Sequence, residues 1–450
     1  MNNTLVRSAM LFGLMTLGCN LAHAKLNAEE TARLGKDLTP TGAEKAGNAS
    51  GTIPAWEGGL TTIPAGYKPE AGYADPFASE KPLFTVTSAN VGQYAAVLSD
   101  GYKALIKQYP GYKMNVYPSH RTLALPAEEY SRIAKEAPNV ELVPGGAGMV
   151  NYGSTSVPFP IPKDGLEAMW NHIVRYRAGG TLRYYSQLIV QSSGSFSAVH
   201  TEARQAMASG LSNPEPNRLF YYLDMVTGPE SLAGLQTLVH EPLDQVKEGR
   251  LAWQYNPGQR RVLRAPEVAY DTPELSADGL RTNDSVDMYN GAPDKYDWKL
   301  IGKKEMLVSY NNYKLNDRSL KYSQIVGKEH MNQDLVRYEP HRVWVVEATL
   351  KPGARHIYAK RRFYLDEDSW NIVQEDLYDG RGELWRVLEA HTLQRYDVAV
   401  NFPSSDVGYD LQARRYLVNG VENEEKAPSQ FGWKGNLREF SPSALRRSGR

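Results

Sequence analysis

The patterns in this sequence that resemble catalytic or metal-binding motifs are each incomplete. His240 and Glu241 begin the His-Glu-x-x-His pattern of zinc metalloproteases, in which two histidines one helical turn apart hold the metal. Asp244 stands where the second histidine is required, and Pro242 would break the helix that presents the pair. The sequence therefore does not indicate a zinc metalloprotease.

Serine, glycine and acidic residues also form short patterns that could do chemistry. Gly194–Ala198 lacks the second glycine of a nucleophile elbow. Gly145–Gly148 lacks both the Lys-Ser/Thr pair and the spacing of a nucleotide-binding loop. Asp366–Asp368 places three carboxylates in an expected turn without the spacing of a calcium loop. We assign no catalytic residue, metal ligand or cofactor, and expect a protein that is not an enzyme; an exported hydrolase with an unrecognised site stays an alternative.

Large apolar side chains gather on one face of the strands expected in the C-terminal half. Eight of them are candidate ligand-binding residues that would line an apolar cavity: Trp253, Tyr255, Trp344, Val346, Leu350, Ile357, Phe363 and Leu365. A curved sheet covered by helices can leave a slot in which an apolar ligand is protected from water. The same pattern is typical of an ordinary core beneath helices, so the sequence leaves closed core and ligand cavity both open.

The first 24 residues have the three parts of a secretory signal peptide. Met1–Arg7 is short and basic, Ser8–Gly18 is apolar, and Ala22–Ala24 supplies the small residues of a cleavage site. Cleavage there predicts an exported, periplasmic protein that starts at Lys25 and no longer contains Cys19, the one cysteine of the sequence.

Lipidation is a second interpretation of the same segment. Thr16–Cys19 resembles a lipobox, in which a lipid on Cys19 would associate the protein with the outer membrane. A lipobox usually has leucine where Thr16 stands, so we favour soluble export over lipidation.

Composition argues against several classes of partner. Lys plus Arg and Asp plus Glu each number 51, so the formal net charge is zero and no basic surface for nucleic acid is indicated. After the signal peptide, no apolar run reaches the roughly 20 residues that a transmembrane helix requires. A mature chain without cysteine has no disulfide and no thiol chemistry. Nothing in the sequence indicates an oligomeric state.

Helical spacing is confined to the N-terminal part of the mature chain. Residues 25–86 contain a short helix and then become rich in Gly and Pro, which indicates an extended arm. Residues 87–180 have mainly helical spacing. The last helix is expected to begin at an Asp164 cap and to end at Gly179 and Gly180.

From Thr181 onward, apolar residues recur every second position, which predicts strands. The expected links between strands are short, so neighbouring strands should be antiparallel hairpins. Tyr409–Val418 is expected to be the final strand. The fold class is therefore α+β: a large, curved, mostly antiparallel sheet over 181–450 with helices over its concave face, in which residues 87–450 form one unit.

Several longer motifs resemble those of domain-of-unknown-function family 1329. They extend over most of the mature chain and include Leu38–Glu44 (LTPTGAE), Gly51–Trp56 (GTIPAW), Pro158–Pro162 (PFPIP), Tyr255–Val262 (YNPGQRRV) and Tyr296–Leu300 (YDWKL). Because these motifs are long and specific, the chain is identified as a member of that family.

The resemblance implies a fold and a setting but no site residues. Members of the family are exported proteins of Gram-negative bacteria, and their fold is similar to that of the lipoprotein carriers LolA and LolB, a half-open barrel with helices over an apolar cavity. The resemblance also implies two partners, a resistance-nodulation-division-type exporter in the inner membrane and an outer-membrane protein. We therefore expect a periplasmic carrier or chaperone for a lipid or other hydrophobic molecule. A non-catalytic adaptor protein of a transport system is the alternative.

Overall fold

The computed structural model describes residues 25–274 and 276–448, so the predicted signal peptide and Cys19 lie outside the described residues. Strands make up most of the regular structure of the described chain. Their bounds are β1 (Phe84–Val86), β2 (Met114–Val116), β3 (Glu141–Leu142), β4 (Met149–Val150), β5 (Gly180–Val190), β6 (Phe196–Met207), β7 (Arg218–Gly228), β8 (Gln236–Pro242), β9 (Leu251–Asn256), β10 (Arg261–Arg264), β11 (Tyr296–Ser309), β12 (Tyr338–Leu350), β13 (Lys360–Asp366), β14 (Ile372–Tyr378), β15 (Leu384–Arg395), β16 (Val400–Asp410), β17 (Arg415–Val421) and β18 (Gln430–Phe431).

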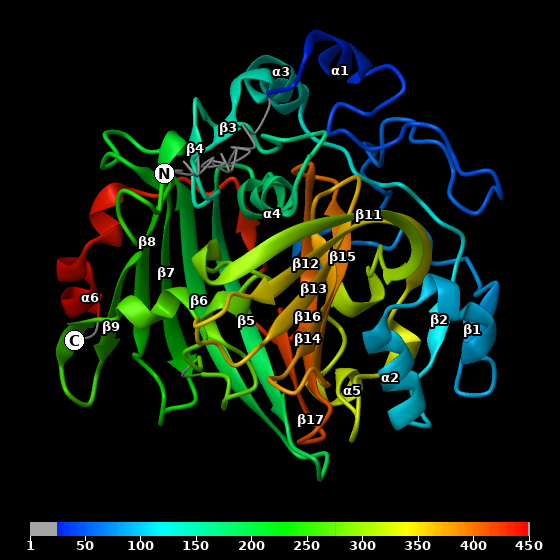
Figure 1. The fold of residues 1–450 in the computed structure, drawn as a ribbon. Coiled ribbons are helices and arrows are strands. Elements are labelled where there is room, and N and C mark those ends of the chain that lie inside the picture. Colours follow the sequence, from blue (N-terminus) through cyan, green and yellow to red (C-terminus); the bar gives the residue numbers. More distant parts are fainter. Residues whose placement is uncertain (1–24, 275, 449–450) are drawn as a thin grey trace, which may run out of the picture.

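All strands except β3 and β4 belong to one open sheet, with the order β1-β2-β12-β13-β14-β15-β16-β17-β5-β6-β7-β8-β9-β10. β11 pairs with β12 and β18 with β5, and every pairing in the sheet is antiparallel except that of β2 with β12. The sheet is strongly curved, and β11 sweeps across the front of it (Figure 1). The predicted α+β class with a large, curved, mostly antiparallel sheet is confirmed.

Helices pack on both faces of this sheet. Their bounds are α1 (Ala28–Arg33), α2 (Asp100–Gln108), α3 (Ala127–Glu136), α4 (Gly165–Val174), α5 (Tyr322–Ile325) and α6 (Pro442–Ser448), with 3-10 helices that include η2 (Val91–Val97) and η10 (Leu437–Phe440). We call the face that contacts α4 the inner face. α2 and α6 pack on the opposite, outer face. None of the helices in the described chain has the length and apolar character needed to cross a membrane.

Local signals explain where α4 begins, but tertiary contacts decide where it ends. Asp164 caps the helix by accepting a hydrogen bond from the backbone N–H of Glu167 at 2.9 Å. The predicted end at Gly179 is too late, because the helix stops at Val174. The next residues turn away so that the buried side chain of Arg175 can pair with Asp287, far along the chain.

The predicted final strand over Tyr409–Val418 is wrong, because a hairpin turn divides it between β16 and β17. Asp410 stabilises the turn by accepting hydrogen bonds from the backbone N–H groups of Gln412 and Ala413. Arg414 has a positive φ of 53°, a value that a continuous strand does not contain.

The N-terminal arm wraps over the rest of the molecule, as the blue segment at the top of Figure 1 shows. The indole of Trp370 donates to the carbonyl of Thr41 at 3.0 Å, and the indole of Trp56 donates to the carbonyl of Leu123 at 2.9 Å. Gly42 has a φ of +92° and passes so close to Pro160 that a Cβ there would lie 1.8 Å from the Pro160 carbonyl oxygen. The arm is therefore docked by specific contacts.

Candidate ligand-binding cavity

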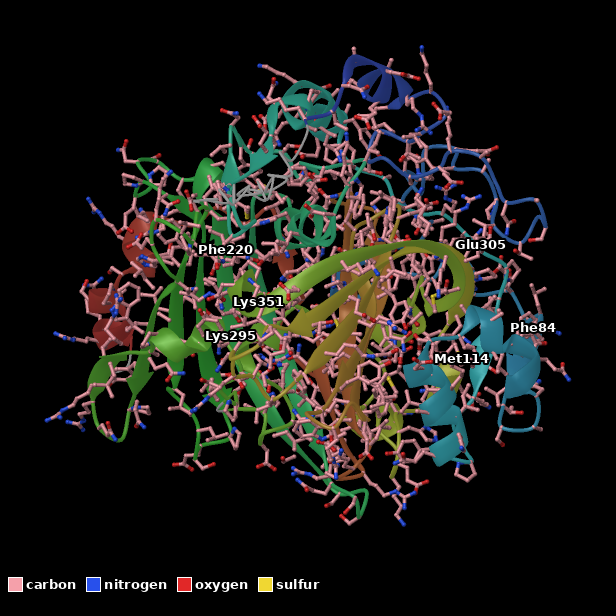
Figure 2. The ribbon with its side chains drawn as sticks, viewed as in Figure 1. Phe84, Met114, Phe220, Lys295, Glu305 and Lys351 are labelled. Atoms are coloured by element: carbon pink, nitrogen blue, oxygen red, sulfur yellow. The ribbon has the colours of Figure 1, made fainter. Side chains whose placement is uncertain are left out.

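A cavity of about 540 Å³ lies on the inner face of the sheet. Its floor is formed by side chains from β5, β6, β7, β8 and β9, and its roof by the segment 264–290 that connects β10 to β11. Phe220, labelled in Figure 2, is part of the wall at β7 and also packs against Trp170 of α4. α4 and the roof thus cover neighbouring parts of the same inner face.

The middle of the cavity is apolar and aromatic. Tyr185 lines it from β5, Tyr222 and Val226 from β7 and Val239 from β8, and Val268 faces them from the roof. The cavity opens toward solvent at β10, where the lining residue Leu263 is 54% exposed. A partly exposed leucine at the mouth continues the apolar surface from the interior to the outside.

The end of the cavity at β5, β16 and β17 is charged. Arg281 pairs with Glu274, and its Nη1 lies 3.6 Å from Asp406. Arg177 pairs with Asp287, which also binds Arg175. These residues tie the roof to the sheet and to the chain that follows α4, because Glu274, Arg281 and Asp287 belong to the roof.

Unlike Arg177 and Arg281, Arg183 has no carboxylate within hydrogen-bond distance among the described residues. Its side chain lines the cavity from β5 and is 16% exposed. The guanidinium carbon lies 4.9 Å from the ring centre of Tyr185 and 4.8 Å from that of Phe402. Its nearest carboxylate oxygen among the described residues is that of Glu422, at 4.0 Å from Nη2. This distance is too long for a hydrogen bond.

The acidic groups of the cavity differ in pKa. Burial raises the pKa of Asp224 to about 7, and the charge of Glu274 adds to the effect. Burial also raises the pKa of Asp406, although Arg281 opposes that shift. Burial alone would raise the pKa of Glu274 as well, but the charge and hydrogen bond of Arg281 bring it below its usual value. Glu274 is therefore ionised near neutral pH, whereas Asp224 is close to half protonated.

Five of the eight predicted lining residues lie together, but outside the cavity. Val346, Phe363 and Leu365 are fully buried in a cluster beneath α4, where Ala168 and Met169 fill the space above them. Trp344 and Leu350 are partly buried at the edge of the same cluster. None of the five lines the cavity described above. A ligand contact by these residues stays a prediction, and in this structure they are packed as core.

The other three predicted residues lie apart from that cluster. Trp253 and Tyr255 pack with Leu445 of α6 on the outer face, and Tyr255 also borders the cavity. Ile357 is 38% exposed and precedes β13. Of the eight, Tyr255 alone is therefore shared between the predicted lining and the walls of the cavity.

The sequence analysis missed the residues that do line the cavity. In β5, the alternation Arg183, Tyr185, Gln187 reads as the solvated face of a half-buried strand, but the cavity and its roof cover this face. One detectable signal was the presence of large aromatic side chains on both faces of the strand. Tyr184 and Tyr185 are adjacent and therefore point to opposite faces, and Tyr185 shares its face with Arg183 and Gln187. Such a pattern is unusual for a strand with one face in bulk water.

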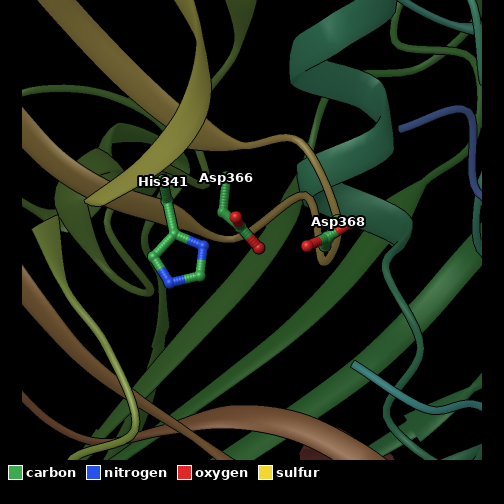
Figure 3. Close-up of side chains that lie close together, drawn as sticks. All are labelled: His341, Asp366 and Asp368. Atoms are coloured by element: carbon green, nitrogen blue, oxygen red, sulfur yellow. The ribbon is translucent and has the colours of Figure 1, made fainter. Parts of the chain in front are cut away.

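A second cluster contains His341 of β12, Asp366 of β13 and Asp368 of the following turn, with potential ligand atoms within 4.8 Å of one another. Figure 3 shows Asp366 between the other two side chains. Arg121 binds both carboxylate oxygens of Asp368, at 2.9 and 2.6 Å, so the chain already supplies a cation there. The same guanidinium lies within 3.4 Å of the carbonyl oxygen of Lys45 in the arm. The cluster therefore works as an ion-pair network that anchors the arm.

The chain matches the family described as "Protein of unknown function (DUF1329)" over residues 85–446. An uncharacterized protein of Pseudomonas aeruginosa, PA3922, is 52% identical over 431 residues, which cover 95% of this chain and 94% of that protein. These matches confirm the resemblance seen in the sequence motifs.

Solved structures with a similar fold share less sequence. A DUF1329 family protein from Desulfovibrio piger is 14% identical with a TM-score of 0.42, over 59% of this chain and 91% of that chain. A LolA superfamily protein from Nitrosomonas europaea is 12% identical with a TM-score of 0.39, over 62% of this chain and 98% of that chain.

Proposed function

The chain belongs to the DUF1329 family of proteins of unknown function, and we propose that it is a carrier that shields a hydrophobic, lipid-like molecule from water. The observation that carries the proposal is the cavity of about 540 Å³ on the inner face, with an apolar middle and an exposed leucine, Leu263, at its mouth. Each Å² of apolar ligand surface removed from water contributes roughly 25 cal/mol, which favours the bound state over the free ligand.

The signal-peptide pattern supports a periplasmic location for the proposed carrier. An exported carrier would receive its ligand from an inner-membrane exporter of the resistance-nodulation-division type and deliver it to an outer-membrane protein. Release would require the roof 264–290 to move, since it covers the cavity between β10 and β11. The carrier binds and releases its ligand without covalent chemistry.

The first test is the identity of molecules that copurify with the exported protein. We expect mass spectrometry of organic extracts to find a lipid or other hydrophobe bound to the native chain. Ala203, which lies in the cavity wall at 4% exposure, offers a blocking variant, Ala203→Trp. The matched control is Ala413→Trp in the exposed turn between β16 and β17.

The blocking variant should lose the copurified molecule and the control should keep it, provided that both melt within a few degrees of the native protein. Absence of any bound hydrophobe from the native protein, together with no binding of an added hydrophobic probe, would contradict the carrier function. The adaptor alternative would then lead.

Export itself has a separate test. Intact mass of the protein recovered from the periplasm should correspond to a chain that starts at Lys25, because Ala22–Ala24 forms a complete cleavage site. A chain that starts at a lipidated Cys19 would contradict soluble export and place the carrier on a membrane.

A further inference from the structure

We propose that the ligand of the cavity is an amphiphile with an anionic head, a carboxylate or a phosphate ester, and that Arg183 binds this head. The inference rests on the proposed carrier function and adds the chemical class of the ligand. It starts from the charged end of the cavity, at β5, β16 and β17.

Arg183 has donors that the protein leaves unused. Its Nε is buried and has no hydrogen-bond partner among the described residues. The guanidinium lies against the faces of Tyr185 and Phe402, and the Glu422 carboxylate, 4.0 Å from Nη2, is too far away for a hydrogen bond. A guanidinium is always charged and carries five N–H donors in a planar fork. Buried donors without partners are unfavourable, and a carboxylate or phosphate can satisfy two of them at once. An anionic ligand head therefore completes this site.

A second guanidinium with an unused donor is close by. Nη1 of Arg281 is buried and has no hydrogen-bond partner in the described chain, while its Nε donates to Glu274. Arg183 and Arg281 both act on the pKa of Asp406, so the two cations face the same part of the cavity. The charge of Arg281 would therefore add to the attraction of a phosphate or carboxylate that binds Arg183.

The balance of charge favours an anion over a cation. The carboxylates of Glu274 and Asp287 are already paired with Arg281 and with Arg177. Asp224 and Asp406 also face the cavity; burial raises the pKa of both, and the value of about 7 for Asp224 reduces the negative charge of Asp224 near neutral pH. Arg183 keeps its full charge under the same conditions.

The apolar middle of the cavity would hold the apolar tail of the amphiphile. Tyr222, Val226 and Val239 continue the lining from the charged end toward Leu263 at the mouth. The distance from β5 to β9 is four strand spacings, about 19 Å. A single extended alkyl chain would therefore lie across the strands, with its head at Arg183 and its end near β9 and β10.

The test compares probes with one alkyl chain and different heads, each below its micelle concentration, by titration calorimetry. We expect dodecanoate and dodecyl phosphate to bind at least tenfold more tightly than dodecanol, because a charged hydrogen bond contributes about 1.5–3 kcal/mol. Arg183→Gln should lose at least tenfold for the anionic probes and less than twofold for dodecanol. Arg183→Lys should keep part of the preference, and Arg261→Gln, an exposed arginine outside the cavity, should keep all of it.

Four outcomes would overturn this inference. Equal binding of dodecanol and dodecanoate would leave the carrier function intact but remove the anionic head. Tighter binding of dodecyltrimethylammonium would assign the head site to Asp224 and Asp406. Inorganic phosphate that binds as tightly as dodecyl phosphate would show a site for a small anion. Binding of no probe at all would contradict the carrier function itself.

Discussion

At the scale of single residues, Glu389 of β15 is a buried acid. No basic residue is among the causes of its shifted pKa. Burial raises the pKa of Glu389 to about 7, against an ordinary value of 4.5, although hydrogen bonds from the hydroxyls of Tyr102, Tyr112 and Tyr338 oppose the shift. Because the folded state holds this proton more tightly than the unfolded chain, stability should fall as pH rises from about 4.5 to about 7.

The variant Glu389→Gln removes this proton linkage while keeping an acceptor for Tyr102, whose hydroxyl donates to Glu389 at 2.9 Å. We expect it to unfold at a higher denaturant concentration than the native protein at pH 8 and to differ less at pH 5.5. Denaturant unfolding at both pH values measures the change. Glu383→Gln, with a side chain that is 64% exposed, is the control. The same pH dependence in Glu389→Gln and the native protein would contradict the assignment.

A variant at Val346 tests whether the cluster beneath α4 is packed core or a ligand cavity. It is fully buried against Ala168 and Met169, so Val346→Asn should lower the free energy of unfolding by about 2–5 kcal/mol. Binding of a hydrophobic probe to the cavity at β5–β9 should be unchanged, because Val346 does not line it.

The control for this variant is Ile357→Asn, since Ile357 is 38% exposed and should change stability by less than about 1 kcal/mol. Weak probe binding in Val346→Asn together with a small loss of stability would show instead that the predicted apolar face is a ligand site.

At the scale of elements, the N-terminal arm is held by close backbone approach as well as by ion pairs. Gly42→Ala would place a Cβ 1.8 Å from the carbonyl oxygen of Pro160, so the arm must move away from that position. We expect faster hydrogen exchange and faster proteolysis of residues 38–60 in this variant. The cavity at β5–β9 should keep its ligand affinity, because no arm residue lines it.

Gly35→Ala is a matched control for the arm. Gly35 has a similar positive φ of 84°, but a Cβ there would meet no atom within 4 Å. Both variants therefore carry the backbone strain of a non-glycine residue at positive φ, and only Gly42→Ala carries the clash. Equal exchange rates in the two variants would mean that close approach at Gly42 does not hold the arm.

At the scale of the whole molecule, the open sheet and the roof 264–290 enclose a cavity that a ligand would complete. A ligand that binds only the folded chain stabilises it by about 2.7 kcal/mol at a hundredfold excess over its Kd. We expect a dodecyl probe at that concentration to raise the melting temperature by roughly 3 °C, and by much less in Ala203→Trp. An equal rise in both proteins would indicate binding outside the cavity.

Much of the architecture follows from local sequence. The caps at Asn27, Ser99 and Asp164 are short-range signals, and the side chain of each accepts a hydrogen bond from a backbone N–H in the first turn of its helix. The two-residue period after Thr181 predicts strands, and short links make consecutive strands antiparallel, so the sheet could be anticipated. The strand predicted across Asp410–Arg414 failed because Leu411 and Ala413 alternate with polar residues, so that the turn has the two-residue period of a strand.

Fold class, family and the incompleteness of the catalytic motifs could be predicted without a structure, because they depend on residue types and spacing along the chain. The face of β5 that meets a cavity could not be predicted in this way. That choice depends on the pairing of β5 with β17, more than 200 residues away, and on a roof that folds back from 264–290. Through those distant contacts Arg183 becomes a largely covered cation whose buried Nε has no hydrogen-bond partner among the described residues, whereas local alternation predicts a solvated arginine.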